Sequence, residues 1–420
     1  MLQKKWTYEA PYIALGILIT LFLLTHIPNS VDFDAPSYIN FDPIRPPLYP
    51  LFIQAFSWAG KYQFTFIVWT HAIITFSALL YTRIWLKRNL NVNDFLIFMM
   101  FLVTTLTILF HFQLMLIGAE GLTFPFFIWT FFILIDCFKK FNLKNILYLS
   151  LWVSAIILTR LQFYYFYGIY IVLILWYLHR STPIKPLGIA VSILTASILL
   201  TCLIDRSYHY IKFGTFTPEP ATGKLLLVQT LFLSTDSTDI QYIKDVKDKY
   251  YFKKMFTQMQ QQQLNKTAAL LTSIRPSYYE LAYEEYNKNY ITIFNLISNN
   301  LKNETPNNAS NISSNIAKSL FNHNIKKNYA FILWKFITFI GGVPVFLFTI
   351  IMAAGLPIRF YNKKYNLNYT EVFVSVIILI TFLNAATVSL FETYQVGYFC
   401  YTQFLFYCLA ALIADRIFLK

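Results

Sequence analysis

Apolar runs close to the length of a membrane-spanning helix recur along the whole chain. A helix that crosses a bilayer needs about 20 mainly apolar residues. About ten segments follow this pattern: 11–27, 64–83, 94–112, 120–138, 145–161, 163–179, 186–204, 330–354, 370–390 and 396–415. The pattern predicts an all-α polytopic membrane protein with about ten transmembrane helices.

The composition agrees with this class. Of the 420 residues, 57% are hydrophobic and 13% are charged, whereas a soluble globular protein carries roughly 25% charged residues. A water-soluble, disordered or fibrous chain is therefore excluded. The net charge of +14 does not indicate a nucleic-acid partner, because the basic residues lie in short loops between apolar runs. The partner that the composition indicates is the lipid bilayer.

Lysine and arginine concentrate in alternate loops, and cytoplasmic loops carry the excess of these residues in membrane proteins. The opposite short loops hold only Arg45, Lys61 and Arg160. We therefore expect both termini in the cytoplasm. The basic residues that mark the cytoplasmic side are Lys4, Lys5, Arg83, Lys87, Arg88, Lys139, Lys140, Lys144, Arg180, Lys185, Arg359, Lys363, Lys364, Arg416 and Lys420.

Three parts follow from this topology. Residues 1–205 form an N-terminal transmembrane module, residues 206–328 an extracytoplasmic loop domain, and residues 329–420 the C-terminal transmembrane helices. The loop domain shows helical periodicity, but its Asn- and Ser-rich stretch 302–328 is expected to be mobile. Residues 46–59 are apolar yet too short to span, which favours an element at the outer interface.

Several ionisable residues from distant segments meet at the outer face in this topology. A charge near hydrocarbon is costly, so such residues indicate a functional site. Each also has a structural explanation. Glu120 begins one span and Arg160 ends another, where the helix dipole favours those signs, and loop carboxylates are often only solvated. The residues at this face are Asp32, Asp34, Asp42, Arg45, Glu120, Arg160, Glu392 and Tyr394.

The first outer loop reads Asp34-Ala35-Pro36-Ser37-Tyr38 and then Arg45-Pro46-Pro47-Leu48-Tyr49-Pro50-Leu51-Phe52. This arrangement resembles the first periplasmic loop of the GT-C membrane glycosyltransferases, which include protein mannosyltransferases and lipid A aminoarabinose transferases. Ala119-Glu120-Gly121-Leu122 and Leu158-Thr159-Arg160 resemble family features more loosely. An Arg-Tyr pair that many members carry before the last span is absent here.

The resemblance implies a glycosyltransferase of the EC 2.4 class that acts in cell envelope biogenesis. Its donor would be a polyprenyl-phosphate-linked sugar, its acceptor a lipid, glycan or protein, and its reaction inverting. Asp34 would be the general base, Arg45 and Arg160 would bind the donor phosphate, and Tyr38 and Glu120 would position sugar hydroxyls or the base. Some relatives need a divalent metal and others do not; Asp32 and Asp34 could hold one, although no metal-ligand cluster stands out.

Other functions remain open at this stage. A flippase or transporter of lipid-linked sugars would place charged or discontinuous segments near the bilayer midplane, and Lys335 is the notable charge inside a span. An O-antigen polymerase or ligase would also have many spans and one large outer loop. A non-catalytic scaffold would give Asp34 and Arg45 no reason to share a loop. The family profile favours a bacterial inner membrane, with the active site on the periplasmic or extracellular side.

Overall fold

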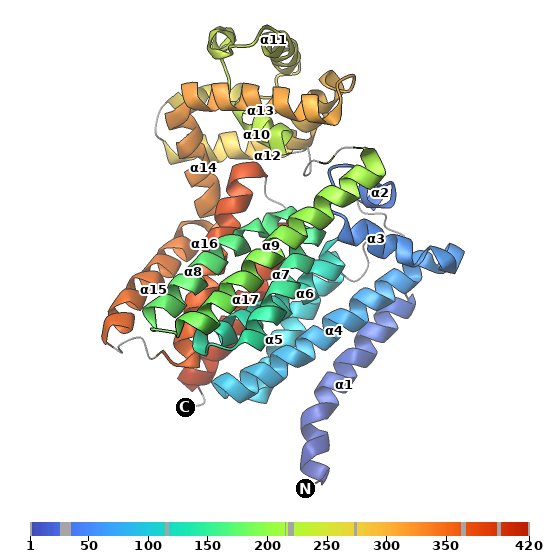
Figure 1. Ribbon diagram of the computed structural model, residues 1–420, viewed down its shortest axis with the longest axis vertical. Coiled ribbons are helices and arrows are strands. Elements are labelled where there is room, and N and C mark those ends of the chain that lie inside the picture. The colour runs from blue at the N-terminus through green and yellow to red at the C-terminus, as the bar shows by residue number, and fades with distance from the viewer. Residues whose placement is uncertain are drawn as a thin grey trace. The chain divides into compact units, whose positions relative to one another are not determined.

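The computed structural model describes residues 2–25, 35–113, 117–214, 216, 222–272, 275–362, 367–392 and 396–418. Within these ranges the secondary structure is helical, without strands (Figure 1). The expected all-α class is therefore confirmed. The chain divides into two compact units, and their bounds differ from the three parts expected from the sequence: Met1–Phe213, Ile350–Asn384 and Val396–Lys420 form the first, and Gly214–Thr349 and Ala385–Gln395 form the second.

The first unit is built around a row of four helices. Neighbours in the row pack in the order α4, α6, α7 and α9, so the hairpin of α6 and α7 lies in its centre (Figure 1). The helical segments of this unit are α1 (Leu2–Thr25), α2 (Ala35–Ile39), α3 (Leu48–Ala55), η1 (Ser57–Tyr62), α4 (Gln63–Leu90), α5 (Asp94–Thr104), η2 (Thr105–Gln113), α6 (Glu120–Lys139), α7 (Leu143–Thr159), η3 (Leu161–Tyr164), α8 (Tyr165–His179), α9 (Ile184–Phe213), most of α16 (Tyr369–Phe391) and α17 (Val396–Phe418).

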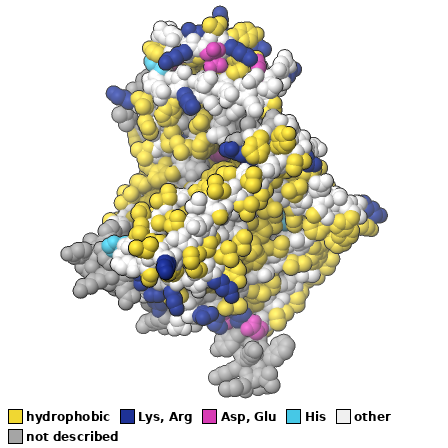
Figure 2. All heavy atoms as spheres, viewed as in Figure 1, with side chains coloured by type: hydrophobic (Ala, Val, Ile, Leu, Met, Phe, Trp, Pro, Cys, Tyr) yellow, Lys and Arg dark blue, Asp and Glu magenta, His cyan; other side chains and the backbone are white. Residues whose placement is uncertain are grey.

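Six helical segments are long and apolar enough to cross a membrane: Ser57–Leu90, Glu120–Lys139, Leu161–His179, Ile184–Phe213, Tyr369–Phe391 and Gly397–Phe418. Apolar side chains cover much of the face of these helices that Figure 2 shows; for example, Leu199 is 65% exposed and Ile171 is 61% exposed. Such a surface is unfavourable in water and suits contact with lipid. The chain is therefore a multi-pass membrane protein.

The expectation of about ten spans is not confirmed. In the part of the chain that the structure describes, the spans expected at 11–27, 94–112 and 145–161 contain apolar helical stretches of 10–17 residues, namely Glu9–Leu24 within α1, Asp94–Leu109 and Leu143–Thr159. The last of these is short because the backbone of Arg160 is extended, with φ −149° and ψ 123°, which stops α7 at Thr159. Apolar composition alone did not reveal this stop.

The expected span 330–354 is two helices, α14 (Ile325–Ile340) and α15 (Gly342–Asn362), bent by 82° relative to each other. The break lies at Gly341 (φ 118°) and Gly342 (φ 80°). Only glycine adopts such left-handed angles at little cost. The break leaves this pair as a seventh, discontinuous candidate span.

An ion-pair network joins the first helices at the end where basic residues gather. The Arg83 guanidinium donates to the Asp94 carboxylate at 2.9 and 2.8 Å and to Glu9 at 2.6 Å. Its Cζ also lies 3.9 Å from the centroid of the Tyr12 ring. Arg83 is only 7% exposed, and a buried charge needs such partners. One arginine thus ties together α1, α4 and α5.

The second unit is a helical domain with its own apolar core. Its segments are α10 (Thr222–Leu233), η4 (Ser237–Tyr242), α11 (Val246–Gln261), η5 (Lys266–Thr272), α12 (Pro276–Asn300), α13 (Pro306–His323), α14 and the first part of α15. The expectation that residues 302–328 are mobile is wrong, because most of them form α13. Thr305 caps this helix by accepting from the amide of Asn308, and its apolar face is buried through Ile312, Ile316 and Leu320.

Helices α10 and α13 approach closely at Gly223. A Cβ atom added there would lie 2.5 Å from the backbone carbonyl oxygen of Ser310, which cannot move without shifting α13. Alanine would gain about 1 kcal/mol of helix propensity over glycine. We expect Gly223→Ala to lose more than this through overpacking, by about 1–3 kcal/mol, and so to lower the thermal midpoint of the purified protein. Gly188→Ala is the control, because no atom lies within 4 Å of that position; equal midpoints for the two variants would contradict the close packing.

Candidate functional site

The described part of the loop expected to face outward forms a helix–turn–helix, from α2 through a turn to α3. After α2 the chain reverses at Phe41, whose φ is 55°, and the amide of Arg45 closes the turn on the carbonyl of Asp42 at 2.9 Å. The turn returns the Arg45 guanidinium to α2. Its Nε donates to Ser37 Oγ at 2.8 Å and its Nη1 to the Tyr38 hydroxyl at 3.2 Å, and its Cζ lies 4.4 Å from the Tyr38 ring centroid.

The last turns of α9 support this loop. The buried imidazole of His209 has Nε2 3.0 Å from the carbonyl oxygen of Pro43 and Nδ1 2.8 Å from that of Asp205. The Lys212 ammonium lies 4.0 Å from the centroid of the Phe41 ring. The loop that carries Tyr38 and Arg45 is therefore fixed to a long membrane helix.

Glu120 and Arg160, predicted from separate spans, form a direct ion pair. Glu120 lies in the first turn of α6, and Arg160 follows the last residue of α7. Their side chains are 18% and 8% exposed. The Arg160 Cζ also lies 4.6 Å from the centroid of the Tyr398 ring. Burial makes this pair costly to break, because either charge alone would be left uncompensated in a low-dielectric environment.

The start of α17 is shaped around this ion pair. A Cβ on Gly397 would lie 2.8 Å from Glu120 Oε1, so glycine leaves room for the carboxylate. Asn384 donates to the Tyr398 carbonyl at 3.0 Å and accepts from Gln162 Nε2 at 3.0 Å. These contacts hold the Tyr398 ring in reach of Arg160. Sequence reasoning missed Gln162, Asn384 and Gly397, although an Asn inside an apolar span is itself a signal.

His71 in α4 connects the two pairs of predicted residues. Its ring stacks on Tyr49 with centroids 5.8 Å apart, and Tyr49 meets Tyr38 edge-on at 5.0 Å. On its other side the imidazole packs against Gly121, where a Cβ would lie 2.3 Å from Nδ1. An unbroken line of contacts thus runs from Arg45 through Tyr38, Tyr49 and His71 to the helix start that holds Glu120.

The His71 imidazole is fully buried, and within the described ranges neither ring nitrogen has a hydrogen-bond partner. A buried polar group without a partner is costly, which makes His71 a candidate to contact a ligand. Sequence reasoning did not single it out. A histidine in the middle of an apolar run was the available signal.

Other predicted residues lie elsewhere. Asp32, Asp34 and Tyr394 are outside the described residues. Asp42 accepts from the Ile44 amide at 3.0 Å and stabilises the turn. Glu392 is assigned to the second unit, where it accepts from the Tyr290 hydroxyl at 2.7 Å. Among the described residues there is no group of three or more His, Cys, Asp or Glu side chains that could hold a metal ion.

Comparison with models of protein families, with curated proteins and with solved structures found no match to this chain. The described helices define a multi-pass membrane protein. The first unit carries a buried ion pair, a guanidinium held by a tyrosine, and an aromatic line between them.

Removal of one partner of the buried ion pair should be strongly destabilising. We expect Glu120→Ala to lower the unfolding free energy by about 3–5 kcal/mol, because Arg160 would remain buried and uncompensated. Replacing Arg160 by methionine in the same chain should restore much of that loss. The measurement is unfolding in mixed micelles, arranged as a double-mutant cycle.

The matched control is the Lys247–Glu304 pair of the second unit, with its nitrogen and oxygen 2.9 Å apart and the lysine side chain 52% exposed. Exposed pairs contribute about 1 kcal/mol or less, so Lys247→Ala should change little. Additive losses for Glu120→Ala and Arg160→Met would contradict a direct coupling between the two side chains.

Proposed function

We propose that this protein is a membrane glycosyltransferase that moves a sugar from a polyprenyl-phosphate donor to a lipid, glycan or protein acceptor. The observation that carries the proposal is the contact line between Arg45 and Glu120, with Arg160 paired to the latter. It joins the three distant segments that the motif resemblance singled out, and it does so through His71 of α4, which the resemblance did not single out. A scaffold protein would not need to bring these groups together.

The two arginines supply the cationic part of the site. Transfer from a phosphate donor creates negative charge on the departing phosphate, and fixed cations stabilise such charge. The guanidinium of Arg45 is oriented by Ser37 and Tyr38, and that of Arg160 by Glu120 and Tyr398. The planar guanidinium fork suits bidentate contact with phosphate oxygens. Arg45 and Arg160 are therefore assigned to the donor phosphate.

The aromatic and polar groups between the arginines suit a sugar. Tyr38 offers a hydroxyl, and the buried rings of Tyr49 and His71 pack behind it, stacked on each other. Glu120 adds a carboxylate, whose oxygens can accept hydrogen bonds from sugar hydroxyls. Tyr38 and Glu120 thus take the positioning roles.

Asp34 is assigned as the general base. It directly precedes α2, which begins at Ala35 and carries Tyr38. A base must take the proton from an acceptor hydroxyl as the hydroxyl oxygen attacks the anomeric carbon. The bond from that carbon to the phosphate oxygen breaks in the same displacement, which inverts the configuration. A polyprenyl donor explains residence in a membrane, and the charge asymmetry of the loops favours the extracytoplasmic face of a bacterial inner membrane.

The assignment of Asp34 predicts that Asp34→Asn abolishes transfer without loss of folded protein. General-base catalysis contributes about 10²–10⁴-fold, so the residual rate should fall by at least about that lower factor. The assay is transfer of label from a radiolabelled polyprenyl-phosphate sugar to a lipid or glycan extract. The control is Asp42→Asn in the same loop, because an amide oxygen can still accept from the Ile44 amide. Near-normal turnover of Asp34→Asn would reject the assignment.

One observation favours the second candidate, a flippase of lipid-linked sugars. Transporters use discontinuous helices, and α14 and α15 form such a broken pair. However, the Lys335 ammonium on α14 donates to Gln229 at 2.9 Å and lies 4.9 Å from the Tyr286 ring centroid, inside the core of the second unit. Protein in vesicles separates the candidates: sugar transfer supports the enzyme, whereas counterflow of the intact donor without transfer supports the flippase.

A further inference from the structure

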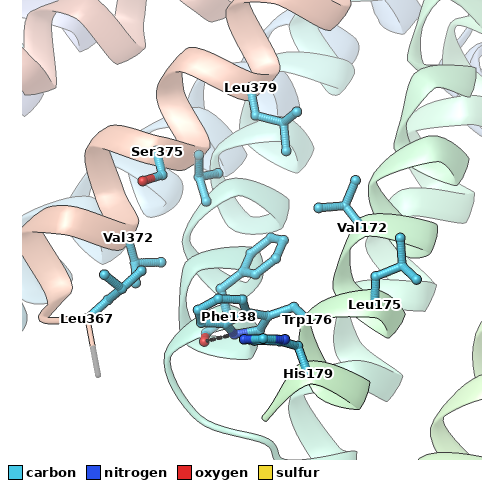
Figure 3. Close-up of a pocket in the computed structure, with 10 residues that line it drawn as sticks. Phe138, Val172, Leu175, Trp176, His179, Leu367, Val372, Ser375 and Leu379 are labelled. Atoms are coloured by element: carbon cyan, nitrogen blue, oxygen red, sulfur yellow. Dashed lines mark hydrogen bonds between the residues drawn. The ribbon is translucent and has the colours of Figure 1, made fainter. Parts of the chain in front are cut away.

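A cavity of about 410 Å³ lies within the first unit, between the end of α6 and the facing sides of α8 and α16 (Figure 3). Its lining residues are mainly apolar and include Phe138, Val172, Trp176, Val372, Ser375 and Leu379. The lining runs from Val172 to His179 on α8 and from Val372 to Leu379 on α16. Seven residues of helix rise about 10 Å, so the cavity is elongated along the helices.

The polar groups in the wall already have partners. Trp176 Nε1 donates to the Phe138 carbonyl at 2.8 Å, a bond also drawn in Figure 3. The Ser375 hydroxyl donates to the Glu371 carbonyl of its own helix at 2.6 Å. Buried water needs two to four polar partners, and apolar cavities without them stay dry. A void would also forfeit the dispersion contacts of its lining. The cavity therefore suits an apolar guest.

The guest can reach the cavity from the bilayer. Both α8 and α16 belong to segments long and apolar enough to span. On the α8 side Leu175 is 58% exposed and Val172 is 41% exposed, so the wall is open rather than sealed by protein. A hydrocarbon chain of a membrane lipid meets these conditions.

Cationic groups surround one end of the cavity. His179 lines it directly, and the adjacent Arg180 is anchored by donating to the Lys139 carbonyl at 3.0 Å, with its Cζ 5.6 Å from the Trp176 ring centroid. The Lys139 ammonium donates to the carbonyl of Leu367, another lining residue, at 2.6 Å. Basic pockets between membrane helices bind anionic lipid headgroups.

The two carboxylates at this end, Glu371 and Asp136, keep their charge but are outnumbered by the basic residues Lys139, Lys140, Arg180 and Lys185. Glu371 accepts from the Asn368 amide at 2.9 Å at the start of α16, and Asp136 accepts from Trp85 Nε1 at 3.1 Å. The exposed Lys140, just after α6, and Lys185, in the first turn of α9, add further positive charge. A phosphate at the mouth would thus meet a net positive field.

We propose that this cavity binds one acyl chain of an anionic phospholipid, whose phosphate lies against His179, Arg180 and Lys139. The site is separate from the candidate catalytic site. Phe138 lies eighteen residues after Glu120 on α6, which corresponds to about 27 Å along the helix axis. The bound lipid supplies the packing between α8 and α16 that protein side chains do not. It is a structural ligand of the membrane domain and not the sugar donor.

Fluorescence quenching tests this directly, because Trp176 lines the cavity. The purified full chain is mixed with phosphatidylglycerol or phosphatidylcholine that carries bromine on the acyl chain. The fluorescence of Trp176 is obtained as the difference between the emission of the wild type and that of Trp176→Phe. We expect that fluorescence to be quenched at lower mole fractions of phosphatidylglycerol, and Arg180→Gln to weaken this preference by about fivefold. Arg206→Gln, which replaces an exposed arginine near the opposite end of the helical layer, should leave it unchanged.

A second variant tests occupancy of the cavity itself. Ser375→Phe places a ring in the cavity and should reduce the Trp176-dependent quenching by both lipids, whereas Ser192→Phe on the exposed face of α9 should not. If Trp176 is not quenched in the wild type, the cavity does not hold lipid and the proposal fails. If both lipids quench equally, the proposed headgroup contact is overturned. If Ser375→Phe does not fold, the difference in quenching between the two lipids, in the wild type and in Arg180→Gln, still tests the proposal.

Discussion

The first unit depends on one buried ion pair. Arg160 stops α7 and turns its guanidinium to Glu120 at the start of α6, while Tyr398 from α17 covers the guanidinium. Three segments that are distant in sequence therefore meet because two charges must compensate each other away from water. The short length of α7 and the small residue at Gly397 both serve this contact. A proposed phosphate-binding arginine is thus also a structural one.

Much of the architecture follows from hydropathy. The all-helical membrane class is confirmed, and six of the expected spans appear as long apolar helices. The sequence also pointed to Tyr38, Arg45, Glu120 and Arg160, and the structure places these residues in two contacting pairs. Arg45, Glu120 and Arg160 were recognisable because a charge at the edge of an apolar run is unusual, whereas Tyr38 was singled out by the motif resemblance. Where a charge must find a partner, single-sequence reasoning has a physical basis.

What the sequence could not show depends on contacts between distant segments. His71 stands out in its apolar run, but only its contacts with Tyr49 and Gly121 connect it to the candidate site. Helix α13 looked mobile because its residues are polar, yet its few apolar residues share one face and pack in a core. The break between α14 and α15 requires positive φ angles at two glycines, and a Gly-Gly pair in an apolar run does not by itself predict those angles. Composition averages over these local details.

Each glycine beside the candidate site restricts which substitutions a residue distant in sequence can accept. At Gly121 and Gly397 the volume that a methyl group would take is occupied by His71 and Glu120, respectively. A larger residue at either glycine becomes tolerable only after its neighbour has shrunk or moved, because packed interiors have no spare room. The order of substitutions therefore matters, and a lineage that changed the glycine first would cross a less stable intermediate. At each of these two pairs, a change in one residue therefore requires a matching change in the other.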